Sequence, residues 1–423
     1  MKKLLFFALA LACGCAAPSA GDGTASSTAT QQPFFEEFFS PERLRIDLVL
    51  AGDKNTQHAY LKELHKEPHW SGNPHTLVDT LGYGQYFYEV FASDTLVFSR
   101  GFSTLFEEWR TTEQAEKVAM AANQSVWMPF PKRTVHFVLY QRIRATGKFT
   151  PMLEFDIDPA DRHIIPGPDN DWRVSALHHN GDPASKVDIA ICAEGYTQAL
   201  MPKFRADAAK MMDYFWTMEP YASRRADFNV WLVESVSEDP GPDIPQNGIW
   251  RRTAMDAMYD TFYEDRYLTI MDHTKIASTV SGAEFDTIII IANDEKYGGG
   301  GIYGSYAMGS SDNARSLPVY IHEFGHSFAG LGDEYYDSST AYIDYFPAGV
   351  EPWEPNITNQ TDFASKWEDM MGQDGVGLFE GAGYQAKGCW RPYEECRMFN
   401  NTAPGFCPVC RRAVGRMIDF YTK

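Results

Sequence analysis

The sequence has little positive charge and no hydrophobic run long enough to cross a membrane. Among its 423 residues, 37 are lysine or arginine and 57 are aspartate or glutamate, which gives a formal net charge of −20. This excess of negative charge disfavours nucleic acid and anionic membrane surfaces as partners. The chain is 44% hydrophobic and 14% aromatic, so it can bury a sizeable core, and its length predicts two domains.

The first residues resemble an export signal. Two lysines precede nine apolar residues at positions 4–12, a run too short for a membrane-spanning helix but typical of a signal peptide. Cys13 or Cys15 follows small residues, as in the cleavage box of a bacterial lipoprotein. We predict a signal over residues 1–20 and a flexible tether over residues 21–32. The protein is then exported, as an outer-membrane or cell-surface lipoprotein or in secreted form, and it contacts membrane only through an N-terminal lipid anchor.

Cysteine is scarce, and most of it lies near the C-terminus. Beyond the predicted signal, the cysteines are Cys192, Cys389, Cys396, Cys407 and Cys410. An oxidising compartment favours two disulfides among the last four, with the pairing left open. The CxxC spacing of the final pair also suits a structural zinc site, which is the alternative. Cys192 follows a predicted strand and has no catalytic partner, so we expect a buried small residue.

The two halves of the chain differ in pattern. Residues 33–160 are rich in β-branched and aromatic residues, and they predict a β-sandwich-like N-terminal domain. A segment rich in proline, glycine and aspartate at 159–174 predicts the boundary. Residues 161–423 then form the second domain, in which strand and helix patterns alternate.

This alternation predicts an α/β fold of parallel strands with crossover helices. The expected strands start at Val187 and cover residues 228–236 and 285–294, and the expected helices cover residues 198–218 and 255–271. Four consecutive glycines at 298–301 are not expected in regular core structure. They predict a bulge or tight bend before an edge strand near residues 302–309.

The motif "HEFGH" at positions 322–326 carries the clearest chemistry. A helix is expected around it, with Ser316 as its cap. Residues four apart share a helix face, so His322 and His326 can bind one zinc ion. Glu323, next to the first histidine, can act as general base toward water on the ion and then pass the proton to the leaving amine.

A catalytic zinc needs a third protein ligand. Gly330 and Gly332 can end the helix and turn the chain back, which would bring the acidic pair behind them to the ion. Asp333 is the predicted third ligand, and Glu334 is the alternative. The other histidines have no spacing typical of ligands.

Three stretches together, "HEFGHSFAGLGDEY", "YGGGGIYGSYA" and "CRMFN…FCPVC", resemble peptidase family M64, whose founding member is known as an immunoglobulin A peptidase. The resemblance covers most of residues 180–423 and extends to the β-rich region before them. It implies a metzincin-like catalytic domain with a methionine turn, for which Met398 is the candidate. It also implies that the strand near 302–309 binds substrate, with Tyr303 and Tyr306 at the cleft. The spacing from His326 to Gly330 is one residue longer than in the metzincin motif.

The sequence therefore predicts an exported zinc endopeptidase that cleaves protein or peptide substrates, a host protein such as immunoglobulin among them, with one catalytic Zn²⁺. The alternative is a surface protein whose β-rich domain binds a glycan or a host protein, and whose metal ion is structural.

Overall fold

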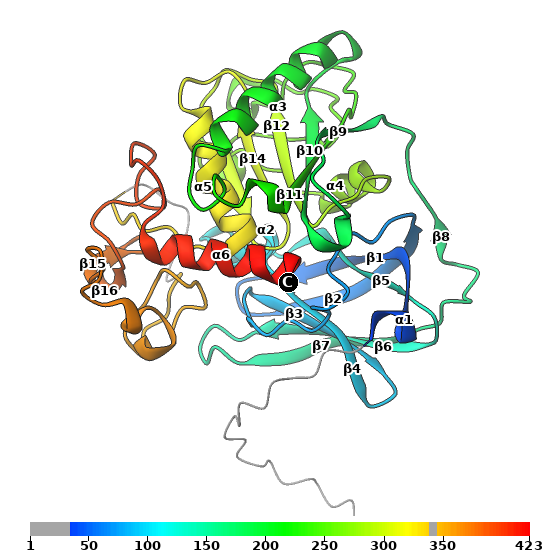
Figure 1. Cartoon of the computed structure of the whole chain (residues 1–423), viewed down its shortest axis with the longest axis horizontal. Coiled ribbons are helices and arrows are strands. Elements are labelled where there is room, and N and C mark those ends of the chain that lie inside the picture. Colours follow the sequence, from blue (N-terminus) through cyan, green and yellow to red (C-terminus); the bar gives the residue numbers. More distant parts are fainter. Residues whose placement is uncertain (1–33, 338–344) are drawn as a thin grey trace, which may run out of the picture. The chain divides into compact units, whose positions relative to one another are not determined.

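The structure is a computed structural model that describes residues 34–337 and 345–423 (Figure 1). The predicted signal and tether, residues 1–20 and 21–32, lie outside the described residues. In the described ranges, no helix has the length and apolar character that a membrane span requires. All of the described residues belong to one compact unit.

The N-terminal half is a pair of four-stranded sheets that share one apolar core. One sheet has the order β5-β1-β2-β8 and the other the order β4-β3-β6-β7. On β1, Leu44, Ile46, Leu48 and Leu50 alternate into the core and are fully buried, as a two-residue period requires. Two short helices, α1 (Phe35–Phe38) and α2 (Leu105–Trp109), accompany these sheets. The strands are β1 (Phe39–Gly52), β2 (Gln57–Glu67), β3 (Tyr86–Ala92), β4 (Thr95–Phe102), β5 (Met120–Pro131), β6 (Val135–Arg142), β7 (Phe149–Ile157) and β8 (Ile165–Pro166).

The C-terminal half is built on a six-stranded sheet with the order β13-β14-β12-β10-β11-β9. The four inner strands are mutually parallel, and the outermost strands, β9 and β13, run antiparallel to their neighbours. Every residue of β10 and β12 is buried, as in a parallel sheet covered on both faces. The strands are β9 (Val174–His178), β10 (Val187–Glu194), β11 (Phe228–Val233), β12 (Thr287–Ala292), β13 (Gly299–Ile302) and β14 (Tyr306–Ser310). A separate hairpin pairs β15 (Phe379–Ala382) with β16 (Gln385–Arg391).

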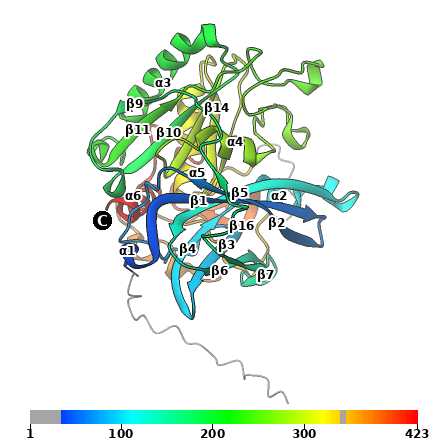
Figure 2. The ribbon, with the colours of Figure 1, turned by 90° about the vertical axis from the view of Figure 1, so that its right-hand side faces the viewer.

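Helices cover both faces of this sheet (Figures 1 and 2). The helices α3 (Met201–Phe215), α5 (Ser316–Ala329) and α6 (Pro408–Thr422) share a core with Ile189 and Ile191 of β10. The helix α4 (His273–Val280) packs on the other face with Cys192. Cys192 is fully buried, as expected from the sequence. The chain is thus a mixed α/β protein with an N-terminal β-rich part.

The helix predicted over residues 255–271 is wrong. This segment holds isolated bridges and a short turn, and Asp260, Phe262 and Tyr263 have positive φ. Its apolar residues, such as Met255, Tyr259 and Leu268, are buried against the sheet, which gives them a helix-like spacing without a helix. The segment instead forms irregular backbone beside β13, with a bridge from Tyr267 to Gly299.

A buried arginine joins the two halves. The guanidinium of Arg43 on β1 donates to Glu67 Oε2 at 2.7 Å. It also donates to the carbonyl oxygens of Val280, Ser281 and Ala283, at and just beyond the end of α4, at 3.3–3.5 Å. The last carbonyls of a helix lack partners within it, so this cation satisfies groups that burial would otherwise leave bare.

We expect Arg43→Met to lower the free energy of unfolding by about 3 kcal/mol or more, because it leaves buried carbonyls and part of a buried carboxylate without their donor. Urea denaturation of the variant measures the change. The control is Lys66→Met, which removes an ion pair with Glu42 whose side chains remain 40% and 34% exposed to solvent. Its expected cost is at most about 1 kcal/mol. Equal losses in the two variants would contradict the importance given to the buried arginine.

Candidate active site

Two histidines of α5 face each other across one turn. His322 Nε2 and His326 Nε2 are 3.1 Å apart. The Nδ1 atom of His322 lies 3.0 Å from the carbonyl oxygen of Arg397, and that of His326 lies 2.5 Å from the carbonyl oxygen of Leu331. A carbonyl oxygen only accepts hydrogen bonds, so each Nδ1 carries the proton and each Nε2 presents its lone pair.

The helix ends where the sequence predicts. Gly330 has φ +64°, a left-handed conformation that glycine adopts without cost, and its N–H donates to His326 O at 3.0 Å. The predicted cap at the other end is displaced by one residue, because the helix begins at Ser316 and Arg315 precedes it. After the turn, Asn356 holds both the N–H and the carbonyl of Gly332, at 2.7 and 2.8 Å.

The turn brings Asp333 to the histidines and turns Glu334 away from them. Asp333 Oδ1 lies 2.9 Å from His322 Nε2 and 3.2 Å from His326 Nε2. The other carboxylate oxygen accepts a hydrogen bond of 2.5 Å from the hydroxyl of Tyr384. Of the two acidic residues that the sequence left open, the structure therefore assembles Asp333 with His322 and His326. No local pattern in the sequence indicates Tyr384, in the turn between β15 and β16, or Asn356, in the irregular segment before that hairpin.

These three groups fit a small divalent cation. Their facing atoms are 2.9–3.2 Å apart, and the edge of a tetrahedral zinc site with nitrogen and oxygen ligands is about 3.3 Å. Asp333 Oδ1 is buried and accepts no hydrogen bond from the described residues. Three acceptor atoms that converge without a donor require a positive charge between them.

Without a metal ion, a proton on His326 supplies part of this positive charge. Burial alone would lower the pKa of His326, but the adjacent Asp333 carboxylate outweighs it and raises this pKa to about 9. Burial opposes ionisation of Asp333, yet the two histidines hold its pKa well below the usual range. The site is therefore built around negative charge on Asp333.

Glu323 lies on the cleft side of α5, close to the strand β13. A Cβ atom on Gly301 would lie 2.3 Å from the carbonyl oxygen of Glu323, and one on Gly299 would lie 3.1 Å from its Oε1. Only glycine allows the strand to approach the helix this closely. The prediction that the glycine run is a bend was wrong, because residues 299–302 form the edge strand itself.

The expected substrate strand near 302–309 also needs correction. Its second half is β14, which pairs with β13 on one side and β12 on the other, so it has no free edge. Tyr306 is buried away from the histidines, and its hydroxyl accepts from Ile270 N at 3.0 Å. Tyr303 does line the cleft, where its ring packs against those of Tyr83 and Trp353.

A cleft of about 320 Å³ opens over His322, Glu323, His326 and Asp333. Burial raises the pKa of Glu323, and the two histidines oppose this rise. Arg266 also lines the cleft, and it comes from the segment that was predicted as a helix. The N-terminal half contributes Ser103 and Glu108 to the wall.

A family model described as IgA Peptidase M64 matches residues 175–375 and 372–418, and one described as Peptidase M64 N-terminus matches residues 34–151. The chain belongs to the M64 peptidase family. The resemblance noted in the sequence is thereby confirmed, and the protein is a peptidase, from a family that suggests metal-dependent catalysis. Among curated proteins, none matches the chain.

Met398 of this M64 peptidase lies beneath the histidine helix. It is fully buried, and a Cβ atom on Gly325 would lie 2.9 Å from its sulfur. Gly325 stands between His322 and His326 on α5, so the thioether lies under the turn that carries both imidazoles. The neighbouring Arg397 supplies the carbonyl oxygen that orients His322.

The two disulfides predicted from the sequence are not formed. All five cysteines of the described residues are free and buried. Cys396 Sγ and Cys410 Sγ are 3.7 Å apart, whereas a disulfide requires about 2.05 Å. Cys389 lies in a separate small core with Phe346 and Ile357.

We expect the metal-free protein to lose stability as the pH rises. The pKa of His326 is about 9 in the folded protein against an ordinary value of 6.5, so the stability from its protonated form is complete below pH 6.5 and is lost toward pH 9. The loss amounts to about 3 kcal/mol. Denaturation in the presence of a chelator at pH 6 and pH 9 measures it. The Asp333→Asn variant is the control, and a pH effect that persists unchanged in it would contradict this origin.

Proposed function

We propose that this M64 peptidase is a zinc-dependent endopeptidase, with His322, His326 and Asp333 as the metal ligands and Glu323 as general base. The observation that carries the proposal is the convergence of two Nε2 atoms and one unpartnered carboxylate oxygen within 3.2 Å at the floor of a cleft. Two imidazoles and a carboxylate are a donor set that zinc prefers, and the cleft leaves an open side for substrate.

A zinc ion held by these residues would polarise the scissile carbonyl and acidify water. Glu323 takes a proton from water and then delivers it to the nitrogen of the leaving amine. Burial raises the pKa of Glu323, which brings it closer to that of a group that both accepts and donates a proton near neutral pH. Arg266 adds positive charge in the same cleft, where negative charge develops on the substrate oxygen.

The substrate in this proposal is a protein or peptide chain. The cleft is bounded by residues of both halves, and it is lined by aromatic side chains such as Tyr267 and Trp353 that suit side-chain contacts. The family description names immunoglobulin A, so a host immunoglobulin is a candidate substrate. The position of Met398 supports a metzincin-like catalytic part. Export with an N-terminal lipid anchor belongs to the same proposal and rests on residues 1–20 of the sequence.

We expect Glu323→Gln to lower the rate of peptide cleavage by about 10²- to 10⁴-fold, because the amide cannot take up a proton. Its bound zinc should remain, since Glu323 is not a ligand in this proposal. Cleavage of a mixture of unstructured peptides, read by mass spectrometry, measures the first effect, and elemental analysis measures the second. Full activity of Glu323→Gln would rule out the general-base assignment.

The matched variant is His326→Ala, which we expect to lose both cleavage and the zinc held at this site. A surface binding protein with a structural metal, the alternative function, gives a different pattern. Neither variant would then affect cleavage, because the wild-type protein would produce no cuts.

The Tyr384→Phe variant tests whether the hydrogen bond from the Tyr384 hydroxyl positions Asp333 as a metal ligand. The phenol hydroxyl is the donor to Asp333 Oδ2, and partners of this kind contribute about 10- to 100-fold in metal affinity. We expect the zinc affinity of the variant to fall by that factor, with the fold unchanged. Competition with a chelator of known affinity measures it, and Tyr336→Phe, at a more exposed tyrosine, is the control. Equal affinities in the two variants would contradict the role of Tyr384.

A further inference from the structure

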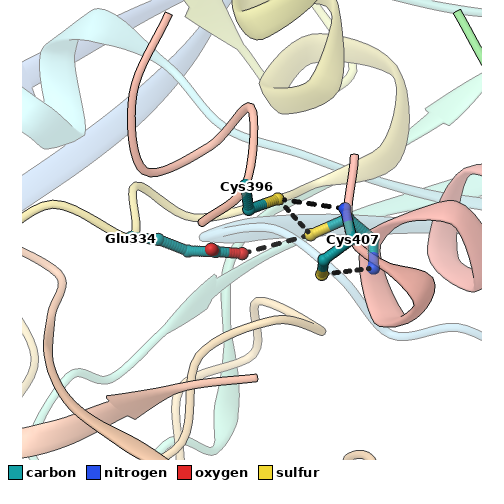
Figure 3. A group of neighbouring side chains, drawn as sticks. Glu334, Cys396 and Cys407 are labelled. Carbon is teal, nitrogen blue, oxygen red and sulfur yellow. Dashed lines mark hydrogen bonds between the residues drawn. The ribbon is translucent and has the colours of Figure 1, made fainter. Parts of the chain in front are cut away.

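Behind Asp333 lies a second group of side chains with metal-binding atoms. Glu334, Cys396, Cys407 and Cys410 place one ligand atom each within 4.8 Å of one another, and all four residues are buried. They come from the segment after α5, the loop before α6 and the first turn of α6. Figure 3 shows the side chains of Glu334, Cys396 and Cys407 directed toward a common centre.

We propose that this M64 peptidase holds a second, structural metal ion, Zn²⁺ by its donor set, between Cys396, Cys407, Cys410 and Glu334. Thiolates select zinc over hard cations such as calcium and magnesium. Four protein ligands without an open position are the arrangement of a structural zinc site, in contrast to the three ligands and open side at the histidines.

The distances agree with tetrahedral coordination. Cys396 Sγ and Cys410 Sγ are 3.7 Å apart, and the edge between two sulfurs of a zinc site is about 3.8 Å. Cys410 Sγ and Glu334 Oε1 are 3.2 Å apart, against an edge of about 3.6 Å between sulfur and oxygen. An odd number of cysteines with a carboxylate among them also cannot be satisfied by disulfides alone.

The carboxylate of Glu334 requires a positive charge that the nearby residues do not fully supply. Its Oε1 accepts from Asn356 Nδ2 at 2.9 Å, but its Oε2 is buried and has no hydrogen-bond partner among the described residues. Arg391 contributes charge from nearby. Its guanidinium, however, donates to Gly381 O at 2.6 Å and stacks on the ring of Phe399 at 4.3 Å. A bound cation supplies the missing charge.

Backbone amides are directed at the sulfurs. The N–H of Cys407 donates to Cys396 Sγ at 3.3 Å, and the N–H of Cys410 donates to Cys407 Sγ at 3.5 Å. The second bond lies at the N-terminus of α6, where the helix dipole favours negative charge. Both features stabilise thiolates, the form in which cysteine binds a metal.

The second ion would also position the groups around the histidines. Glu334 follows Asp333 directly, and its N–H donates to Met398 O at 2.9 Å. Cys396 precedes Arg397, whose carbonyl oxygen orients His322. The proposed ion therefore joins the backbone that carries Asp333 to the backbone that supports His322.

Metal content of the full chain, purified without chelator or reductant, tests the proposal. We expect two equivalents of zinc in the wild type, and one each in His326→Ala and Cys410→Ser, which lose different ions. Cys389→Ser is the matched control, because this cysteine is buried outside the cluster, and it should retain two.

Cobalt substitution keeps the test decisive if Cys410→Ser does not fold. Among the candidate metal-binding groups of the described residues, only the cysteine cluster contains sulfur, so thiolate-to-cobalt charge-transfer absorption should persist in His326→Ala. One equivalent of zinc in the wild type that falls to none in His326→Ala would overturn the proposal. So would a disulfide between any two of Cys396, Cys407 and Cys410, found by mass spectrometry of peptides from the unreduced protein.

Discussion

The arrangement of both clusters depends on the short segment that follows the left-handed turn at Gly330. Its adjacent residues Asp333 and Glu334 point to opposite sides, one toward the histidines of α5 and the other toward the cysteines near α6. The segment is held from three directions, by Asn356 at Gly332, by the carbonyl of Met398 at Glu334 and by the N–H of Gly383 at the carbonyl of Asp333. A displacement of this backbone would affect the charge balance of both clusters together.

The position of α5 against the sheet is a second constraint. Strand β13 lies so close to the helix that a single methyl group on Gly301 would overlap the carbonyl of Glu323. This contact places the glutamate at the edge of the sheet, beside the cleft. Tyr267 pairs with Gly299 on the outer side of β13, and Glu108 from the N-terminal half accepts a hydrogen bond from the hydroxyl of Tyr267 at 2.6 Å. The N-terminal half thus supports the cleft wall through direct contacts.

Local sequence patterns predicted the structural features that are determined by residues close together in the chain. The two histidines four apart, the glutamate between them and the glycine that ends the helix all follow from helix geometry, and the structure brings them together. The buried strands at 187–194 and 287–292 were equally visible as apolar runs. These features depend on residues within about one or two turns of one another.

Other features depend on contacts between distant segments, and the sequence could not reveal them. The choice between Asp333 and Glu334 is made by Tyr384, Asn356 and Met398, which no local pattern connects to the motif. The apolar residues in 255–271 recur at a helix-like spacing because the sheet buries their side chains. The glycine run forms most of strand β13, because α5 lies so close to this strand that a larger residue would not fit. The disulfide prediction rested on the compartment, whereas the structure places three of the cysteines, free and buried, beside the carboxylate of Glu334 from another part of the chain.

Because the carbonyl oxygen of Arg397 orients His322, it determines when the candidate active site can assemble during protein synthesis. Arg397 is synthesised 75 residues after His322, so a nascent chain that already has the histidine motif still lacks the backbone that orients it. The cleft wall also includes Phe399, Asn400 and Asn401, which closely follow Arg397. The histidines therefore gain their orienting backbone only after Arg397 and the residues that follow it have been synthesised.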